Sequence, residues 1–339
     1  MIRFVGLIRV AWVIAMFAAA VSCNVHEWPE APEKEQYVLR LVFDTEFTPW
    51  NHTCDGLKLT DAGRGAGVGS VLDHGYMHYI VRAYPKINGV SQQRYYDEFE
   101  FSRNVMSGYD CDLTLDLAAG DYTVKVWSEL TESEGGSTCY DTGNFREIRL
   151  SGDHAANTDY RDAFRGTVEI TVESHIDVRV PDCSLVEMER PLAKYEFVLT
   201  EMQSFLDANG GVIGDYEAVV YYTAFMPCAY NMFTDRANDS STGVSYSSEV
   251  VSRGSDEATL CFDYVFVGVS ETAVQLRMEL RRKSDKSVVS RTEELRVPLL
   301  RGELTVVRGV FTTTSSGGSG SSGGVGVEPG FDGDYNIEI

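Results

Sequence analysis

The sequence predicts an all-β protein with two β sandwiches in tandem, and three observations support this. Many short segments alternate apolar and polar residues with a period of two, which is typical of half-buried strands. Breaks rich in Gly, Asn and Asp separate these segments, as they do in sandwich folds. The pattern L-x-x-G-[DE]-x-T-V occurs at 117–124 and again at 299–306, in opposite halves of the chain. Each copy is typical of a strand end, a turn glycine and a new strand, so we expect two similar domains.

The expected strands follow from this alternation. Alternating segments occur at 37–43, 167–173, 176–180, 274–281 and 295–299. Continuous apolar runs at 218–222 and 264–267 are typical of interior strands. Helical signals are few: 200–210 has a candidate N-cap, Thr200, and an Asn-Gly stop, and 159–164 has the length of one helical turn. We expect both to be connectors between strands.

The length of the chain also favours two domains. Pro181 ends one expected strand and Pro191 precedes another, which places the domain boundary between them. We predict a signal peptide at 1–22, a polar spacer at 23–36, a first sandwich at 37–184, a second sandwich at 185–314, a Ser/Gly tether at 315–324 and a C-terminal strand at 325–339.

The N-terminal segment predicts export and lipidation. The apolar stretch 10–21 follows a basic start and is too short to span a bilayer, which needs roughly 20 apolar residues. It ends in Ala-Val-Ser-Cys at 20–23, and small residues before a cysteine resemble a bacterial lipobox. Cys23 is then the lipidated residue, and several acyl chains would anchor the protein stably. The alternative is a plain secreted protein in which this cysteine occurs by chance.

Composition limits the function further. The formal net charge of −22 argues against nucleic-acid binding, which needs a basic face. The even number of cysteines after Cys23 permits disulfides in an exported protein, and we expect at least one bridged pair. Sequence alone leaves the pairing open among Cys54, Cys111, Cys139, Cys183, Cys228 and Cys261.

No catalytic, metal or cofactor site is predicted. His74 and His78 are the only clustered histidines, but the neighbouring strand pattern separates their side chains by about 13 Å. No nucleophile elbow, P-loop or dinucleotide fingerprint occurs. The glycine-rich stretch 61–69 lacks the Lys-Ser/Thr of a phosphate loop, and 332–334 lacks EF-hand spacing. We therefore expect a binding or structural protein rather than an enzyme.

The C-terminal segment alternates after ten residues of only Ser and Gly. Phe331, Tyr335, Ile337 and Ile339 share one face of the expected strand. The tether has a typical reach of roughly 17 Å and an extended reach of roughly 35 Å. Two alternatives follow: the strand is donated to a neighbouring subunit with these side chains buried, or it packs on its own second sandwich.

Six sequence blocks form a recognisable series: GDYTVKVWSEL (120–130), TGNFREIRL (142–150), NTDYRDAFRG (157–166), VEMERPLAKYEFVLTEM (186–202), AFMPCAYNMFTD (224–235) and the C-terminal GFDGDYNIEI. In this order, after a lipobox, they resemble the FimB/Mfa-type fimbrial subunit family. The resemblance implies two transthyretin-like sandwiches in an outer-membrane lipoprotein of type V pili. It also implies assembly by β-strand addition, in which stalk subunits lose an N-terminal strand to a protease and anchor subunits keep it.

The resemblance therefore implies a structural, non-enzymatic fimbrial anchor or minor subunit. It also implies lipid on Cys23, other fimbrial subunits as partners, and a surface-exposed position on the outer membrane.

 

Arg40 lies inside the first expected strand and resembles a trypsin-like cut site of the family. The apolar alternation continues through it from Tyr37 to Phe43, which favours an uncut core strand, as an anchor requires.

Two other classes of function stay open. One is a carbohydrate-binding surface lipoprotein or pilus tip adhesin, although no strand displays a clear row of aromatic residues. The other is a hydrolase, which needs paired carboxylates across a cleft.

Overall fold

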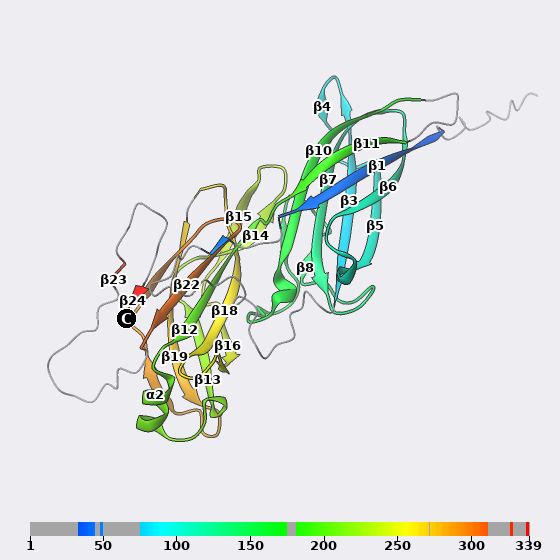
Figure 1. Ribbon diagram of the computed structural model, residues 1–339. Coiled ribbons are helices and arrows are strands. Elements are labelled where there is room, and N and C mark those ends of the chain that lie inside the picture. Colours follow the sequence, from blue (N-terminus) through cyan, green and yellow to red (C-terminus); the bar gives the residue numbers. More distant parts are fainter. Residues whose placement is uncertain are drawn as a thin grey trace, which may run out of the picture.

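The computed structural model describes residues 33–44, 48–49, 75–174, 181–270, 272–310, 326–327 and 337–338. In this part of the chain, two β sandwiches lie end to end (Figure 1). Strands make up most of the described residues, and the only α-helix among them is α2 (Met202–Asn209). The predicted all-β class is therefore confirmed.

The first sandwich contains a three-stranded sheet in the order β11-β1-β6, which faces a sheet in the order β10-β7-β3 with β5 and β4 both paired to β3. Its strands are β1 (Lys34–Phe43), β3 (Tyr76–Ile87), β4 (Val90–Ser91), β5 (Asp97–Asn104), β6 (Cys111–Ala118), β7 (Gly120–Thr131), β10 (Ala163–Val172) and β11 (Asp182–Met188). The short helices η2 (Val105–Ser107) and η3 (Asp159–Arg161) connect strands.

The second sandwich also contains two sheets. One has the order β17-β18-β12-β22-β2, and the other has β16-β13-β19 with β20 and β21 both paired to β19. The strands are β2 (Thr48–Pro49), β12 (Leu192–Leu199), β13 (Tyr216–Tyr222), β16 (Ser245–Glu249), β17 (Val251–Ser252), β18 (Ala258–Phe266), β19 (Thr272–Arg282), β20 (Val288–Arg291), β21 (Leu295–Leu299) and β22 (Glu303–Gly309). Helix α2 and the short η4 (Ile213–Asp215) precede β13.

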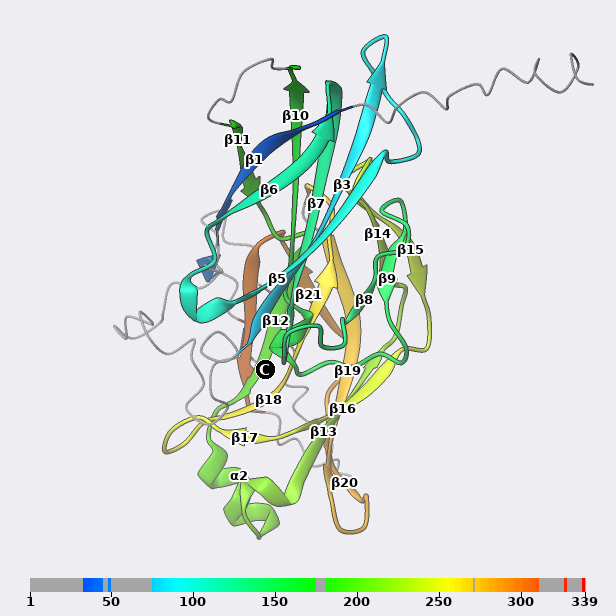
Figure 2. The same cartoon turned by 90° about the vertical axis from the view of Figure 1, so that its right-hand side faces the viewer.

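A further sheet joins the two sandwiches in the order β15-β14-β9-β8 (Figure 2). Strands β8 (Tyr140–Asp141) and β9 (Ile148–Leu150) follow β7 of the first sandwich. Strands β14 (Met226–Asn231) and β15 (Arg236–Ser241) follow β13 of the second. Strand β9 pairs with β14, so backbone hydrogen bonding continues from one sandwich into the other.

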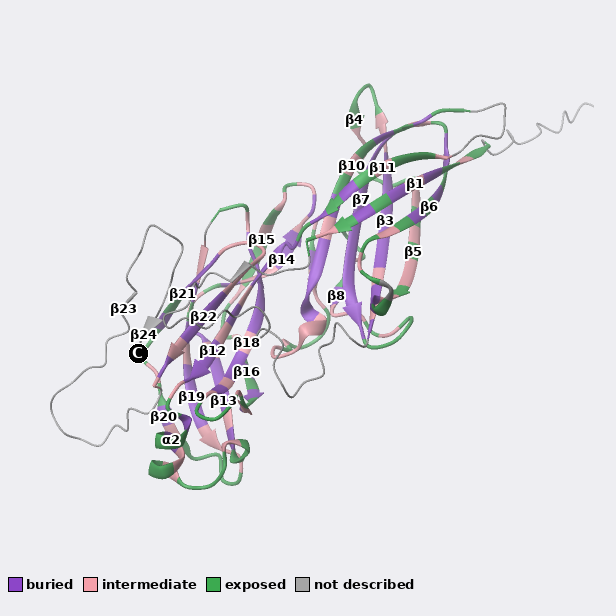
Figure 3. Cartoon of the chain, in the orientation of Figure 1, coloured by how far each residue is buried: buried purple, intermediate pink, exposed green. Residues whose placement is uncertain are grey.

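Buried residues line the inner faces of both sandwiches (Figure 3). The first core includes Leu39, Leu115 and Val126, and the second includes Phe197 and Leu276, all fully buried. The alternation of buried and exposed residues along the strands explains these cores, because successive side chains point to opposite faces of a sheet.

The expected elements agree with the structure where it describes them. The segments predicted at 37–43, 167–173, 218–222, 264–267, 274–281 and 295–299 coincide, within a residue at their ends, with parts of β1, β10, β13, β18, β19 and β21. The predicted helix at 200–210 contains α2, although its N-cap is Glu201 rather than Thr200. The predicted single turn at 159–164 contains η3. The strand expected at 176–180 lies outside the described residues.

The two copies of the repeated pattern occupy equivalent corners. The first connects β6 to β7, and the second connects β21 to β22; in each case the chain passes from one sheet of a sandwich to the other. Gly302 at the second corner has φ of +71°, a conformation that favours glycine. The interpretation as strand, turn glycine and strand thus describes both corners.

Sheet membership changes later in the chain than the predicted boundary between 184 and 185. That boundary falls inside β11, which pairs with β1 from Asp182 to Met188. The next strand, β12, belongs to the second sandwich. Strand β2 also crosses the predicted division, because it precedes most of the first sandwich in sequence but pairs with β22.

Candidate functional site

The first described strand occupies the middle of its sheet. Strand β1 pairs in parallel with β11 on one side and antiparallel with β6 on the other. Tyr37, Leu39 and Leu41 point into the first core and are buried. Removing β1 would therefore leave a groove between β11 and β6 with two unpaired strand edges and an open core.

Arg40 lies on the solvent side of β1. Its guanidinium donates two hydrogen bonds to the carboxylate of Asp112, from Nε at 2.9 Å and from Nη2 at 3.0 Å. The two residues are register partners across β1 and β6. This hydrogen-bonded ion pair raises the pKa of Arg40 and lowers that of Asp112. Arg40 is thus part of a paired strand in the middle of a sheet.

In the second sandwich, the outer edge of β22 is paired along only a small part of its length. On its inner side β22 pairs with β12 over six residues, from Leu304 to Gly309. On its outer side the described strands pair only with Glu303 and Leu304, through β2. The outer edge of β22 from Thr305 to Gly309 has no strand partner among the described residues, over a length of roughly 16 Å.

The described part of the C-terminal segment lies beside this edge. Strand β24 (Ile337–Glu338) pairs antiparallel with β23 (Gly326–Val327). Figure 1 shows β24 next to the second sandwich, and its backbone lies close to β22. Neither strand joins the sheet of β22 in the described residues. Ile337 belongs to β24, whereas Phe331, Tyr335 and Ile339 lie outside the described residues.

The junction between the sandwiches has an apolar core of its own. Buried residues from both sides form one cluster: Ile80, Tyr84, Trp127, Tyr140, Phe145, Ile148 and Ala163 from the first half, and Leu192, Tyr230, Met232, Tyr264 and Phe266 from the second. The rings of Tyr230 and Phe266 stack with centroids 5.7 Å apart. Burial of this size and shape holds the two sandwiches as one unit.

A buried carboxylate also joins the sandwiches. Asp263 of β18 is fully buried and forms an ion pair with Arg161 of η3. Its Oδ2 lies 2.8 Å from Nε2 of His154 and accepts a 2.6 Å hydrogen bond from the Tyr222 hydroxyl. Arg161 also donates to the backbone carbonyl of Tyr264. The buried charges are therefore paired and hydrogen-bonded across the junction, as stability requires.

Four more ion pairs lie at the junction. Arg190 binds Asp162 through Nε at 2.8 Å and Nη2 at 2.9 Å, and both side chains are buried. Lys194 lies 2.8 Å from Asp159. Asp235, in the turn between β14 and β15, binds one arginine from each sandwich at 2.9 Å: Arg165 from β10 and Arg301 from the second.

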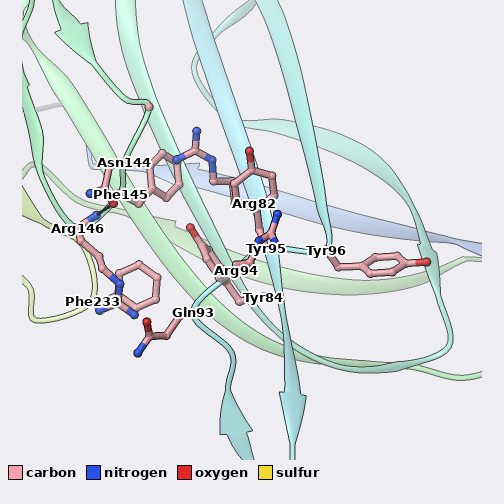
Figure 4. A pocket seen from close by; sticks show the side chains of 11 residues that line it. Arg82, Tyr84, Gln93, Arg94, Tyr95, Tyr96, Asn144, Phe145, Arg146 and Phe233 are labelled. Atoms are coloured by element: carbon pink, nitrogen blue, oxygen red, sulfur yellow. Dashed lines mark hydrogen bonds between the residues drawn. The ribbon is translucent and has the colours of Figure 1, made fainter.

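A pocket of about 390 Å³ opens where the two sandwiches meet (Figure 4). Its walls come from β3, the β4–β5 loop, the β8–β9 loop and the β14–β15 turn. They combine arginines, aromatic rings, side-chain amides and one glycine: Arg82, Arg94, Arg146, Tyr84, Tyr95, Tyr96, Phe145, Phe233, Gln93, Asn144 and Gly143. This volume lies within the range of small-molecule sites, roughly 300–1,000 Å³.

The pocket is cationic in an acidic protein, since no acidic residue lines it. Arg82 is neutralised by Glu98 at 2.5 Å and lies over the Phe145 ring at 4.2 Å. Arg146 lies over the Phe233 ring at 3.9 Å. Among the described residues, neither Arg146 nor Arg94 has a carboxylate within ion-pair distance. The sequence offered no row of aromatic residues here, because these rings come from separate loops.

The expected disulfide is not present in the described part of the chain. Cys111, Cys139, Cys183, Cys228 and Cys261 are free thiols, and Cys54 lies outside the described residues. An even cysteine count permits pairing but does not bring the sulfur atoms together. Cys261 lies in the second core, where burial raises its pKa, and burial also raises the pKa of Cys139 to about 11. Both are therefore unreactive thiols near neutral pH.

The remaining predicted residues are only partly described. Cys23 and His74 lie outside the described residues, and His78 lies in strand β3. Within the described ranges, no group of three or more His, Cys, Asp or Glu side chains is arranged to hold a metal ion. No helix of that part is long and apolar enough to cross a membrane.

Comparisons with known proteins give one family match. The model of a family of unknown function, DUF6562, matches residues 43–339. No curated protein matches the chain. Similar solved structures include the fimbrial anchor protein Mfa2 from Porphyromonas gingivalis, at 12% identity and a TM-score of 0.39, covering 76% of this chain and 82% of that one. A fimbrial assembly protein from Parabacteroides distasonis has 12% identity and a TM-score of 0.39, covering 84% and 94%. Likeness at this level supports no inference about function.

Proposed function

The chain belongs to the DUF6562 family, and we propose that it is a structural, non-enzymatic subunit of outer-membrane fimbriae, as an anchor or minor subunit. In this proposal, lipid on Cys23 holds the protein in the outer membrane and β-strand addition joins it to neighbouring subunits. The sequence blocks that resemble fimbrial subunits support it. Five of these blocks, at 120–130, 142–150, 157–166, 186–202 and 224–235, supply strands or contacts of the junction described above.

The observation on which the proposal depends is the outer edge of β22. Thr305 to Gly309 present backbone groups on a side where the described residues offer no strand partner. A strand from a neighbouring subunit can add to such an edge through backbone hydrogen bonds, and its alternate side chains then fill pockets. The second candidate partner for this edge is the C-terminal segment of the same chain, which already places β24 beside it.

The position of β1 favours an anchor over a stalk subunit. A stalk subunit must release its first strand, which here would cost the pairing of β1 with two neighbours and the burial of Leu39 and Leu41. An anchor keeps its N-terminus and its lipid. The proposal therefore includes an uncut Arg40.

Deleting the gene tests the anchor function directly. We expect fimbriae to appear in the culture medium rather than on cells, because their base has lost its lipid attachment. Fimbriae that stay attached in unchanged amount and length would refute an anchor. Re-expression with Cys23→Ala separates the lipid from the fold: a folded protein should then be released together with its fibres.

Locking β1 in place tests whether the strand must leave. Val38 is the register partner of Thr114 on β6 and of Cys183 on β11. In a Cys183→Ser background, Val38→Cys with Thr114→Cys should therefore form a disulfide between β1 and β6. We expect the locked protein to anchor fimbriae normally. The matched control is Gln275→Cys with Arg296→Cys, a partner pair across β19 and β21. Loss of anchoring in the first double variant alone would show that β1 must be released.

A further inference from the structure

We infer that the pocket between the sandwiches binds an anionic sugar unit of a glycan, with its carboxylate held by Arg94 and Arg146. This goes beyond the proposed anchoring function and depends on different residues. Three features of the pocket support it: its uncompensated charge, its exposed aromatic rings and its construction from both sandwiches.

The charge of the pocket selects an anion. Arg94 and Arg146 have no carboxylate within ion-pair distance among the described residues, whereas Arg82 is already paired with Glu98. Stacking on Phe233 fixes the plane of the Arg146 guanidinium, and leaves its N–H edge available. A planar guanidinium binds a carboxylate with two parallel hydrogen bonds. The net charge of −22 makes such a local cationic site unusual on this protein.

The rings and amides select a sugar rather than a bare anion. Tyr95 is 43% exposed, and Arg82 lies over its ring at 4.9 Å, so the other face of the ring remains available for the C–H face of a pyranose. Tyr96 also lines the pocket, but its ring points away from the other labelled side chains (Figure 4). Gln93 and Asn144 place amide groups in the same walls, which can bond to sugar hydroxyls. The side-chain oxygen of Asn144 accepts from the backbone N–H of Arg146, which leaves its NH₂ group to donate.

The pocket is held in shape by contacts across the junction. Tyr84 packs edge to face on Phe233 with centroids 5.0 Å apart, which joins β3 to the β14–β15 turn. Lys125 donates to the backbone carbonyl of Met232 at 3.0 Å from the other sandwich. A site assembled by two rigid bodies in this way loses little entropy when a ligand binds.

Titration calorimetry on the full chain in detergent tests the inference. The probes are trigalacturonate, the neutral galactotriose, a tri-glutamate peptide and inorganic phosphate. We expect trigalacturonate to bind at least tenfold more tightly than each of the others. Arg146→Gln and Arg94→Gln should each weaken that binding roughly tenfold, because each removes charge-assisted hydrogen bonds. Arg146→Lys should restore only part of it, since lysine lacks the planar fork.

The matched control is Arg277→Gln. Arg277 also lies over a tyrosine ring, that of Tyr221 at 5.0 Å, but on β19 of the second sandwich and outside the pocket. This variant should bind trigalacturonate like the wild type, and near-UV circular dichroism should show that all variants are folded. Equal affinity for the neutral sugar or the peptide, no binding of trigalacturonate, or unchanged binding in Arg146→Gln and Arg94→Gln would each overturn the inference. None of these results would affect the fimbrial release expected from the gene deletion.

Discussion

The junction between the sandwiches and the outer edge of β22 both contain strand edges, but the two edges differ in how far they are paired and covered. At the junction, β9 pairs with β14 and the contact is covered by buried rings and paired charges. At the outer edge of β22, the described cover is the two-residue strand β2. The first edge is closed by many interactions that form together. The second edge has little strand cover among the described residues, and under the proposed function it accepts a strand from a neighbouring subunit.

Under the proposed function, this difference separates the contacts that make the subunit rigid from the edge that would serve assembly. The proposed fimbrial anchor would need its two sandwiches to move together under force, and a buried apolar cluster with ion pairs across it couples them in this way. An assembly edge needs backbone groups that remain accessible to a partner. The predictions below test this contrast, beginning with the largest expected effect.

We expect the largest decrease in the free energy of unfolding for Asp263→Asn. The variant leaves the buried guanidinium of Arg161 without its counterion, and removing one member of a buried pair costs about 3–5 kcal/mol. Urea unfolding should show this loss of stability. The single unfolding transition of the wild type should separate into two in the variant, because its sandwiches are no longer coupled. The control, Asp239→Asn, removes an exposed partner of Arg149 and should change stability too little to resolve. Equal losses in the two variants would mean that Asp263 does not hold the junction.

Truncating a buried side chain of β9 at the junction should lower the free energy of unfolding slightly less. Ile148 is fully buried in the junction cluster and pairs with Tyr230 across β9 and β14. Ile148→Ala should therefore reduce the free energy of unfolding by about 3 kcal/mol, through lost burial and the cavity left behind. Val288→Ala on β20 is the control, since Val288 is 45% exposed. A loss at Ile148 no greater than at Val288 would show that β9 contributes little to the junction.

The sequence predicted the strands better than the contacts between them. Alternation located β1, β19 and β21 because one face of each strand is buried. The junction could not be derived in the same way, because Phe145 and Phe233 lie in loops without a periodic pattern. Ion pairs such as Arg161 with Asp263 join residues about a hundred positions apart, and residue spacing cannot indicate such contacts. The blocks that resemble fimbrial subunits did include several of these residues.

The pH dependence of stability tests the base of the β8–β9 hairpin. Glu129 is fully buried and accepts hydrogen bonds from the backbone N–H groups of Cys139 and Tyr140 and from the Trp127 indole. Burial raises the pKa of Glu129 from 4.5 to about 7, although these hydrogen bonds lower it. Between these two values the folded state holds a proton that the unfolded state has released. Stability from this group is therefore complete below pH 4.5 and falls as pH rises to 7.

The expected loss across that range is on the order of 2–3 kcal/mol. Urea unfolding at several pH values between 4 and 8 should show it in the wild type and not in Glu129→Gln. Glu134→Gln, at an exposed acid in the following loop, should retain the wild-type profile. Parallel profiles for the wild type and Glu129→Gln would contradict the raised pKa of Glu129.

The smallest effect on stability is expected for changes beside the outer edge of β22. Deleting 325–339 removes β23 and β24, which pair with each other and not with the sheet of β22. We expect a change in the free energy of unfolding below about 1 kcal/mol, because a two-stranded pair is marginal by itself. A loss of several kcal/mol would instead mean that the segment completes its own sandwich permanently.

The shortened chain also shows whether the edge accepts a strand in trans. A labelled peptide of residues 325–339 should bind to it, measured by fluorescence anisotropy, whereas the intact chain should bind more weakly because its own segment competes. A peptide with serine at Phe331, Tyr335, Ile337 and Ile339 should not bind, since strand addition needs alternate side chains to fill pockets as well as backbone pairing. Equal binding of both peptides would leave backbone pairing as the whole interaction, and the edge would then lack the selectivity that ordered assembly of a fibre requires.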